Sequence, residues 1–92
     1  MHPAAHALHA PPGFEQRVRD SFARQAAMTT LGARLGAIEA GRVELLMEHR
    51  AELTQQHGFL HAGIVAAALD SACGYAAFTL MPMVLASFLR LV

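Results

Sequence analysis

The chain has 92 residues, of which 54% are apolar, and equal numbers of basic and acidic residues give no net charge at pH 7. This length fits at most one small domain, and the apolar fraction excludes disorder throughout. The neutral balance, without a basic cluster, argues against nucleic-acid binding. One cysteine cannot staple a secreted mini-protein, and the N-terminus lacks a signal-peptide pattern, so a cytoplasmic location is expected.

The first twelve residues differ from the rest of the chain. They contain three histidines and three prolines without any periodicity, which predicts a flexible N-terminal arm over residues 1–12 and a domain over residues 13–92. Apolar residues then recur every fourth position at Phe14, Val18 and Phe22, with charged residues between them. This spacing predicts a helix that begins near Gly13 and lies on a larger core.

An alternating pattern follows the first helix. Val43, Leu45 and Met47 alternate with other residues at period two, which is typical of a strand. A glycine in the stretch 39–42 suits a tight turn, so the sequence predicts an antiparallel hairpin with strands at 33–39 and 42–49. A polar loop is expected over residues 50–57. An isolated hairpin is only marginally stable in water, so this one must pack against something else.

A long alanine-rich stretch without proline predicts a helix over residues 62–80. Small residues surround Asp70 on one side of this helix at the helical period. The larger residues lie outside that sector and are expected to pack the core. The small residues near Asp70 are Gly63, Ala66, Ala67, Cys73, Gly74 and Ala77, and the larger ones are Ile64, Val65, Leu69, Tyr75 and Phe78.

Asp70 in apolar surroundings suggests a chemical role, because an unpaired buried carboxylate is costly. It is interpreted as a general base or nucleophile whose pKa is set by partial burial, with a solvent-facing acid as the alternative. Free backbone N–H groups at the helix start, over residues 61–63, are candidates for holding an oxyanion. Together the two features suggest acyl transfer to water, that is, a hydrolase.

Three other readings receive less support. His57 and His61 have a spacing that suits zinc, but the third ligand would have to come from His49 or Glu52. Cys73 is a nucleophile only if a base lies beside it. The stretch 62–81 is apolar enough for a membrane-spanning alternative, which a midpoint aspartate disfavours.

The motif Gln-Gln-His-Gly-Phe-Leu-His-Ala-Gly over residues 55–63, followed by an aspartate nine residues after His61, resembles the PaaI-type branch of the hotdog-fold acyl-CoA thioesterases. The resemblance runs from about Phe14 to Pro82. It implies an α+β hotdog-like fold, in which an antiparallel sheet wraps around one long central helix. It also implies a homo-oligomer, a dimer or a tetramer, with active sites at the subunit interface.

The resemblance also implies roles for individual residues. Asp70 is expected to be the general base or nucleophile, and the N–H groups of Ala62 and Gly63 to polarise the thioester carbonyl. Gln55 stands where the family often has an asparagine that positions water or substrate, and Ala62 replaces the first glycine of a pair. An acyl-CoA is the expected substrate, with no metal, no cofactor, no nucleic acid and no membrane as partners. The expected substrate-binding residues are His57, Gly58, Phe59 and His61.

The sequence after the long helix departs from this family pattern. The resemblance implies about four further strands, whereas residues 83–92 are enough for one. The expected fold is therefore incomplete, because C-terminal strands are missing. This leaves an alternative in which the chain is a non-catalytic truncated subunit, or a binding module, that associates with a full-length hotdog partner.

Overall fold

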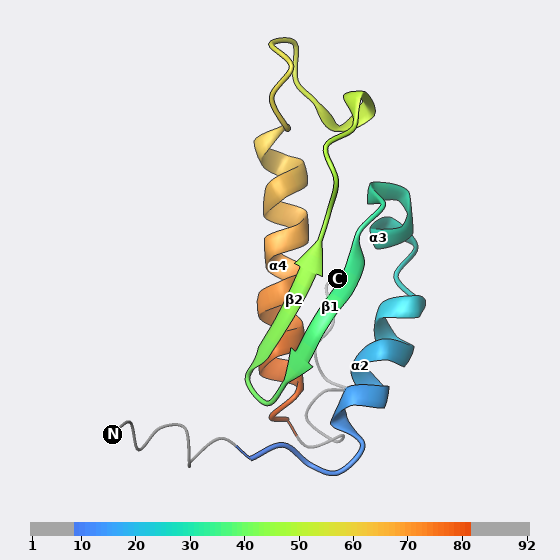
Figure 1. Cartoon of the computed structure of the whole chain (residues 1–92), viewed down its shortest axis with the longest axis vertical. Helices are drawn as coiled ribbons and strands as arrows, with labels where there is room; N and C mark the ends of the chain where they lie inside the picture. The colour runs from blue at the N-terminus through green and yellow to red at the C-terminus, as the bar shows by residue number, and fades with distance from the viewer. Residues whose placement is uncertain (1–8, 82–92) are drawn as a thin grey trace, which may run out of the picture.

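The computed structural model describes residues 9–81, so most of the predicted arm and the whole of the stretch 83–92 lie outside the described residues. Within residues 9–81 it has three α-helices, two strands and a short 3-10 helix, whose arrangement Figure 1 shows. In chain order they are α2 (Phe14–Ala23), α3 (Ala26–Leu31), β1 (Arg34–Glu39), β2 (Arg42–Leu46), η1 (Ala51–Leu53) and α4 (Ala62–Phe78).

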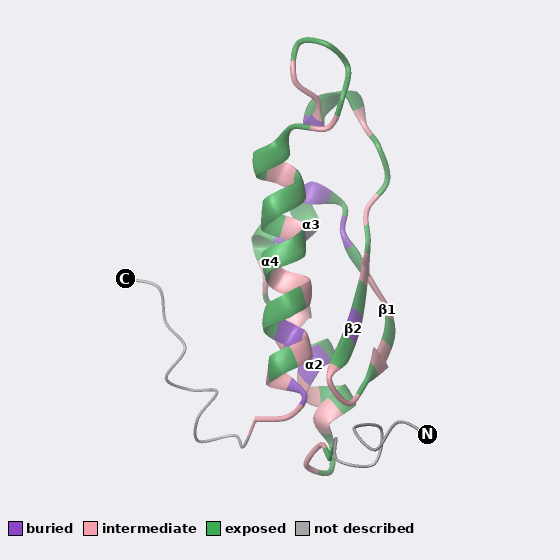
Figure 2. Cartoon of the chain, turned by 90° about the vertical axis from the view of Figure 1, so that its left-hand side faces the viewer, coloured by how far each residue is buried: buried purple, intermediate pink, exposed green. Residues whose placement is uncertain are grey.

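The two strands form an antiparallel hairpin, and both long helices pack against the same face of it (Figures 1 and 2). Helix α4 packs against β2, whereas α2 packs against β1. The predicted α+β arrangement, a long helix against an antiparallel sheet, is therefore present. Within residues 9–81 each strand has one strand neighbour only, which leaves the outer edge of each without a partner strand.

Helix α2 begins where it was predicted and buries the expected face. Gly13 precedes it in the left-handed conformation, with φ of 79°, and Val18 is fully buried. Helix α3 was not predicted, because six residues are too short to display helical periodicity. It is held by tertiary packing, since Met28 and Leu31 belong to a buried cluster with Ala33 and Leu53.

Strand β2 is shorter than predicted, because it ends at Leu46 rather than at residue 49. Strand β1 begins at Arg34, which pairs with Leu46, so β2 has no partner strand after Leu46. Gly32, two residues before Arg34, adopts φ of 70° at the end of α3. Residues 47–49 therefore have nothing to pair with. Arg50 turns instead toward α3, where its guanidinium donates to the carbonyl of Thr30 at 2.8 Å.

Strand β1 contains a bulge that sequence periodicity did not reveal. The register shifts between Leu35 and Ile38, so β1 has one residue more than β2 over this interval. The carboxylate of Glu44 accepts the N–H of Ala37 at 3.0 Å. A Cβ at Gly36 would lie only 2.7 Å from the same carboxylate, so a larger residue here would displace the Glu44 side chain.

Tyr75 joins α4 to the rest of the fold. Its ring belongs to a buried cluster with Val18 and Val43, and its hydroxyl bonds to Ser21 at 3.1 Å and to Gln25 at 2.7 Å. One side of α4 is thereby fixed on α2 and β2. No helix within residues 9–81 is long and apolar enough to cross a membrane.

Two of the larger residues of α4 do not pack as predicted. Val65 and Leu69 were expected to pack the core, but they are 44% and 61% exposed. The prediction failed because the elements within residues 9–81 cover only the side of α4 that carries Tyr75. The size of the side chains therefore did not predict correctly which residues of α4 are buried.

Thr79 offers a test of how the hairpin turn is held to α4. Its fully buried hydroxyl accepts the N–H of Gly41 at 2.8 Å and donates to the carbonyl of Ala76 at 2.7 Å. The isosteric Thr79→Val leaves the Gly41 donor unpaired, which should lower the free energy of unfolding by about 1 to 3 kcal/mol. Urea denaturation measures this loss. The exposed Thr29→Val is the matched control, and an equal change in both variants would contradict the assigned bonds.

Candidate functional site

The start of α4 is capped by a histidine side chain. His61 has extended backbone angles, and its Nδ1 accepts the N–H of Gly63 at 2.9 Å. The N–H groups of Ile64 and Val65 both bond to the carbonyl of His61. The N–H of Ala62, by contrast, donates to no acceptor among the described residues 9–81. Of the two expected oxyanion donors, Ala62 is free and Gly63 is occupied by the cap.

The loop before α4 uses its polar groups internally. The Oε1 of Gln55 accepts the N–H of His57 at 2.6 Å, so this side chain shapes the loop rather than extending toward the helix start. Gly58 has φ of 86°, and its carbonyl pairs with His49 Nε2 at 3.0 Å. The expected substrate-binding residues His57, Gly58 and Phe59 are all exposed here, Phe59 to 71%.

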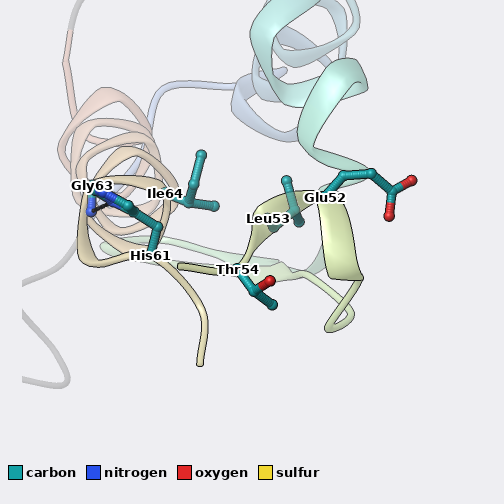
Figure 3. A pocket seen from close by; sticks show the side chains of 6 residues that line it. All are labelled: Glu52, Leu53, Thr54, His61, Gly63 and Ile64. Atoms are coloured by element: carbon teal, nitrogen blue, oxygen red, sulfur yellow. Dashed lines mark hydrogen bonds between the residues drawn. The ribbon is translucent and has the colours of Figure 1, made fainter. Parts of the chain in front are cut away.

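A hollow of about 380 Å³ lies between the helix start and η1 (Figure 3). Leu53 and Ile64 supply its apolar surface, and the carboxylate of Glu52 points away from α4 at the outer rim. Of the site residues expected from the sequence, the hollow brings together only His61 and Gly63. Its complete lining is Glu52, Leu53, Thr54, His61, Gly63 and Ile64.

Sequence reasoning did not identify Leu53, Thr54 or Ile64 as lining residues. They come to the helix start through two tertiary contacts: the N–H of His61 bonds to the carbonyl of Leu53 at 2.9 Å, and Thr54 forms a β-bridge with Leu60. Neither contact has a sequence pattern. The only sequence signal for these lining residues was the presence of polar residues beside the motif over residues 55–63.

Asp70 lies in the middle of the exposed side of α4, among the small residues expected around it. It forms no ion pair and no side-chain hydrogen bond with the other described residues. The sequence interpretation required partial burial of this carboxylate. The described residues do not provide that burial, and Asp70 is exposed among them, as in the alternative interpretation of a solvent-facing acid.

The free N–H of Ala62 and the carboxylate of Asp70 are too far apart to act on one carbonyl. At a rise of about 1.5 Å per residue they are separated by about 12 Å along α4, and the backward lean of the side chain shortens this by only about 2 to 3 Å. A carbonyl held at about 3 Å from a donor and attacked from about 3 Å spans about 7 Å at most. One copy of α4 therefore cannot supply both groups to a direct attack.

Metal and cysteine chemistry receive no support from the geometry. Within the described part of the chain, no three side chains of His, Cys, Asp or Glu come together in a way that would hold a metal ion. The zinc alternative at His57 and His61 therefore lacks its third ligand. Cys73 is exposed on α4 and is a free thiol.

Comparison with known proteins gives one informative match. A crystal structure of a thioesterase family protein from Silicibacter pomeroyi superposes with a TM-score of 0.75 and 67% sequence identity. The match covers 76% of this chain and 52% of that chain, so the chain spans about half the length of the structure it matches. No family model and no curated protein matches. The α+β fold is thus that of a hotdog-type thioesterase, over the matched part.

The histidine cap at the start of α4 is open to a direct test. His61→Ala removes the acceptor for Gly63 and should destabilise the chain by about 1 kcal/mol, whereas His61→Asn keeps a capping oxygen and should lose less. Urea denaturation measures the difference. Amide exchange at Gly63 should become faster in the alanine variant only, and equal exchange rates in both variants would contradict the cap.

Proposed function

We propose that the chain is part of a PaaI-type acyl-CoA thioesterase, which hydrolyses a thioester to a free acid and CoA. The observation that carries this proposal is the 67% identity with a thioesterase family protein over three quarters of the chain. The unpaired N–H of Ala62 supports it further, because this donor at the start of α4 is accessible to a substrate.

The proposed reaction uses few protein groups. The Asp70 carboxylate accepts a proton from a water molecule, whose oxygen attacks the thioester carbonyl, or attacks the carbonyl itself as a nucleophile. The negative charge on the carbonyl oxygen is stabilised by the N–H of Ala62 at the positive end of the helix dipole. The carbon–sulfur bond then breaks, and the thiolate takes up a proton to leave as free CoA. On the nucleophilic route the acyl group stays on Asp70 as a mixed anhydride, which a water molecule then hydrolyses to the free acid and the Asp70 carboxylate. Gln55, His57, Gly58 and Phe59 would line the approach through the loop that they form.

The proposed enzyme is a homo-oligomer, because one copy of α4 cannot bring its own Ala62 and Asp70 to one carbonyl for a direct attack. A two-fold dimer solves this by placing the helix start of one copy beside Asp70 of the partner subunit. The small residues around Asp70 leave room for a substrate at such an interface. The partner would also supply the burial that Asp70 lacks here.

A second candidate function is that of a non-catalytic subunit, which binds a longer thioesterase-type chain. The exposure of Val65 and Leu69 favours it, because uncovered bulky residues on one helix side are a binding surface. It differs from the first candidate in a simple way. The purified chain would then release no CoA from any acyl-CoA on its own.

The shared active site can be tested with two complementary variants. Asp70→Asn removes the base or nucleophile and should lower kcat by about 100- to 10,000-fold. Ala62→Pro removes only the N–H, because proline is tolerated at the first helical position and His61, with φ of −64° and ψ of 132°, already has the angles that precede proline. It should lower kcat by about 100- to 1,000-fold.

Mixing the two inactive variants then distinguishes the arrangements. If Ala62 and Asp70 act across a dimer, half of the sites in a mixed dimer are intact, so an equal mixture should recover about a quarter of the parent activity. A mixture that stays inactive would contradict the shared site. Release of CoA, followed with a thiol reagent, is the assay, and an inactive parent chain would favour the second candidate function.

A further inference from the structure

The ring of His61 and the backbone of Gly63 fit closely together at the start of α4. The Nδ1 atom accepts the N–H of Gly63 at 2.9 Å, so the ring turns back over its own helix (Figure 3). A Cβ at Gly63 would lie 3.2 Å from Nδ1 and 3.3 Å from Cε1 of this ring, which is closer than side chains normally pack. The absence of a side chain at Gly63 therefore leaves room for the ring.

This hydrogen bond forms only while the His61 ring is neutral. A neutral imidazole has one nitrogen that donates and one that accepts, whereas an imidazolium has two donors. Because Nδ1 accepts the N–H of Gly63, the proton of the neutral ring is on Nε2. A second proton would make Nδ1 a donor that faces another donor, at the positive end of the helix dipole. The protonated ring then has to turn away from Gly63, and its exposed position allows this.

The groups around the His61 ring do not respond to its charge in the same way. Glu52 of η1 directs its carboxylate away from α4, and Leu53 and Ile64 are apolar. The first turn of α4 has no acidic residue, and Asp70 lies about 13.5 Å further along the axis. None of the ion pairs among residues 9–81 includes His61. Within this part of the chain, the Gly63 cap is the interaction of the ring that a proton would break.

The loop before α4 keeps its hydrogen bonds when histidines become charged. His49 Nε2 pairs with the carbonyl of Gly58 at 3.0 Å, and this nitrogen is the donor because a carbonyl only accepts. It carries a proton in both the imidazole and the imidazolium, so acid does not break this bond. His57 is held through its backbone N–H, which donates to Gln55, and its ring is exposed. Protonation therefore releases the Gly63 cap without releasing the loop.

We propose that the His61 ring sets the number of free N–H groups at the start of α4, one while the ring is neutral and two after it takes up a proton. Histidine side chains change charge between about pH 5 and pH 8, so mild acid would free the Gly63 N–H beside that of Ala62. Adjacent free N–H groups at a helix start hold a negatively charged oxygen together. The release itself depends only on the fold, whereas its use for an oxyanion rests on the proposed function.

The test follows the full 92-residue chain by NMR between about pH 8 and about pH 5, the range over which histidine titrates. At the higher pH the ring nitrogen shifts of His61 should show the Nε2–H tautomer, and at the lower pH an imidazolium. The protection of the Gly63 N–H against exchange, corrected for the intrinsic effect of pH, should fall about fivefold, as for the loss of an N-cap. Ile64 and Val65 are the internal reference, because they bond to the carbonyl of His61 and should change less.

His61→Asn is the matched variant, because asparagine keeps a capping oxygen at every pH. Its Gly63 protection should be equal at both ends of the pH range. The proposal is overturned by an Nδ1–H tautomer at the higher pH, by a ring that stays neutral at the lower pH, or by Gly63 protection that does not change when the ring becomes charged. An equal loss of protection in His61→Asn would also overturn it, because another group would then be responsible. None of these measurements needs turnover, so the result is distinguishable from a failure of the proposed function.

Discussion

The packing of Tyr75 holds the described fold together. Its ring fills the space between α2 and β2 against Val18 and Val43, and its hydroxyl is satisfied by two side chains of the first helix and the turn after it. A buried phenol without such partners would be unfavourable, so ring and hydroxyl have to be accommodated together. This one residue sets which side of α4 is buried. The side that carries Asp70 therefore faces outward.

The orientation of α4 has a direct consequence for chemistry. The helix presents its two candidate groups on one exposed side, the free N–H of Ala62 at the start and the Asp70 carboxylate two turns later. Their separation along the axis is too large for one substrate carbonyl. This separation is compatible with the proposed dimer, in which each site would take one group from each of two copies.

The same orientation leaves two bulky residues of α4 exposed to solvent. Val65 and Leu69 are exposed, the sheet has two strands within residues 9–81, and the chain spans about half of the thioesterase family protein that it matches. Exposed apolar residues on one part of a helix form a surface that another polypeptide can cover. The exposed residues are therefore more informative about partners than the buried ones.

The sequence by itself determined the elements whose side chains repeat with a clear period. The four-residue spacing of Phe14, Val18 and Phe22 predicted α2, and the alternation around Val43 predicted β2. The alanine-rich stretch predicted α4, with a carboxylate at its middle. Such patterns work because each records which face of a local structure meets the core. The motif before α4 also pointed to the thioesterase-type fold, since the polar residues and glycines there are specific in order and spacing.

Only the tertiary structure decided the rest. The position of helix α3 determines where β2 ends. Because α3 ends at the Gly32 cap, β1 starts only at Arg34, and β2 has no partner strand after Leu46. The bulge at Gly36 depends on a carboxylate across the hairpin, and the Gly63 cap depends on the ring of His61. Whether Leu69 is buried depends on the width of the sheet beneath it. These are contacts between separate segments, and residue periodicity within one segment does not encode them.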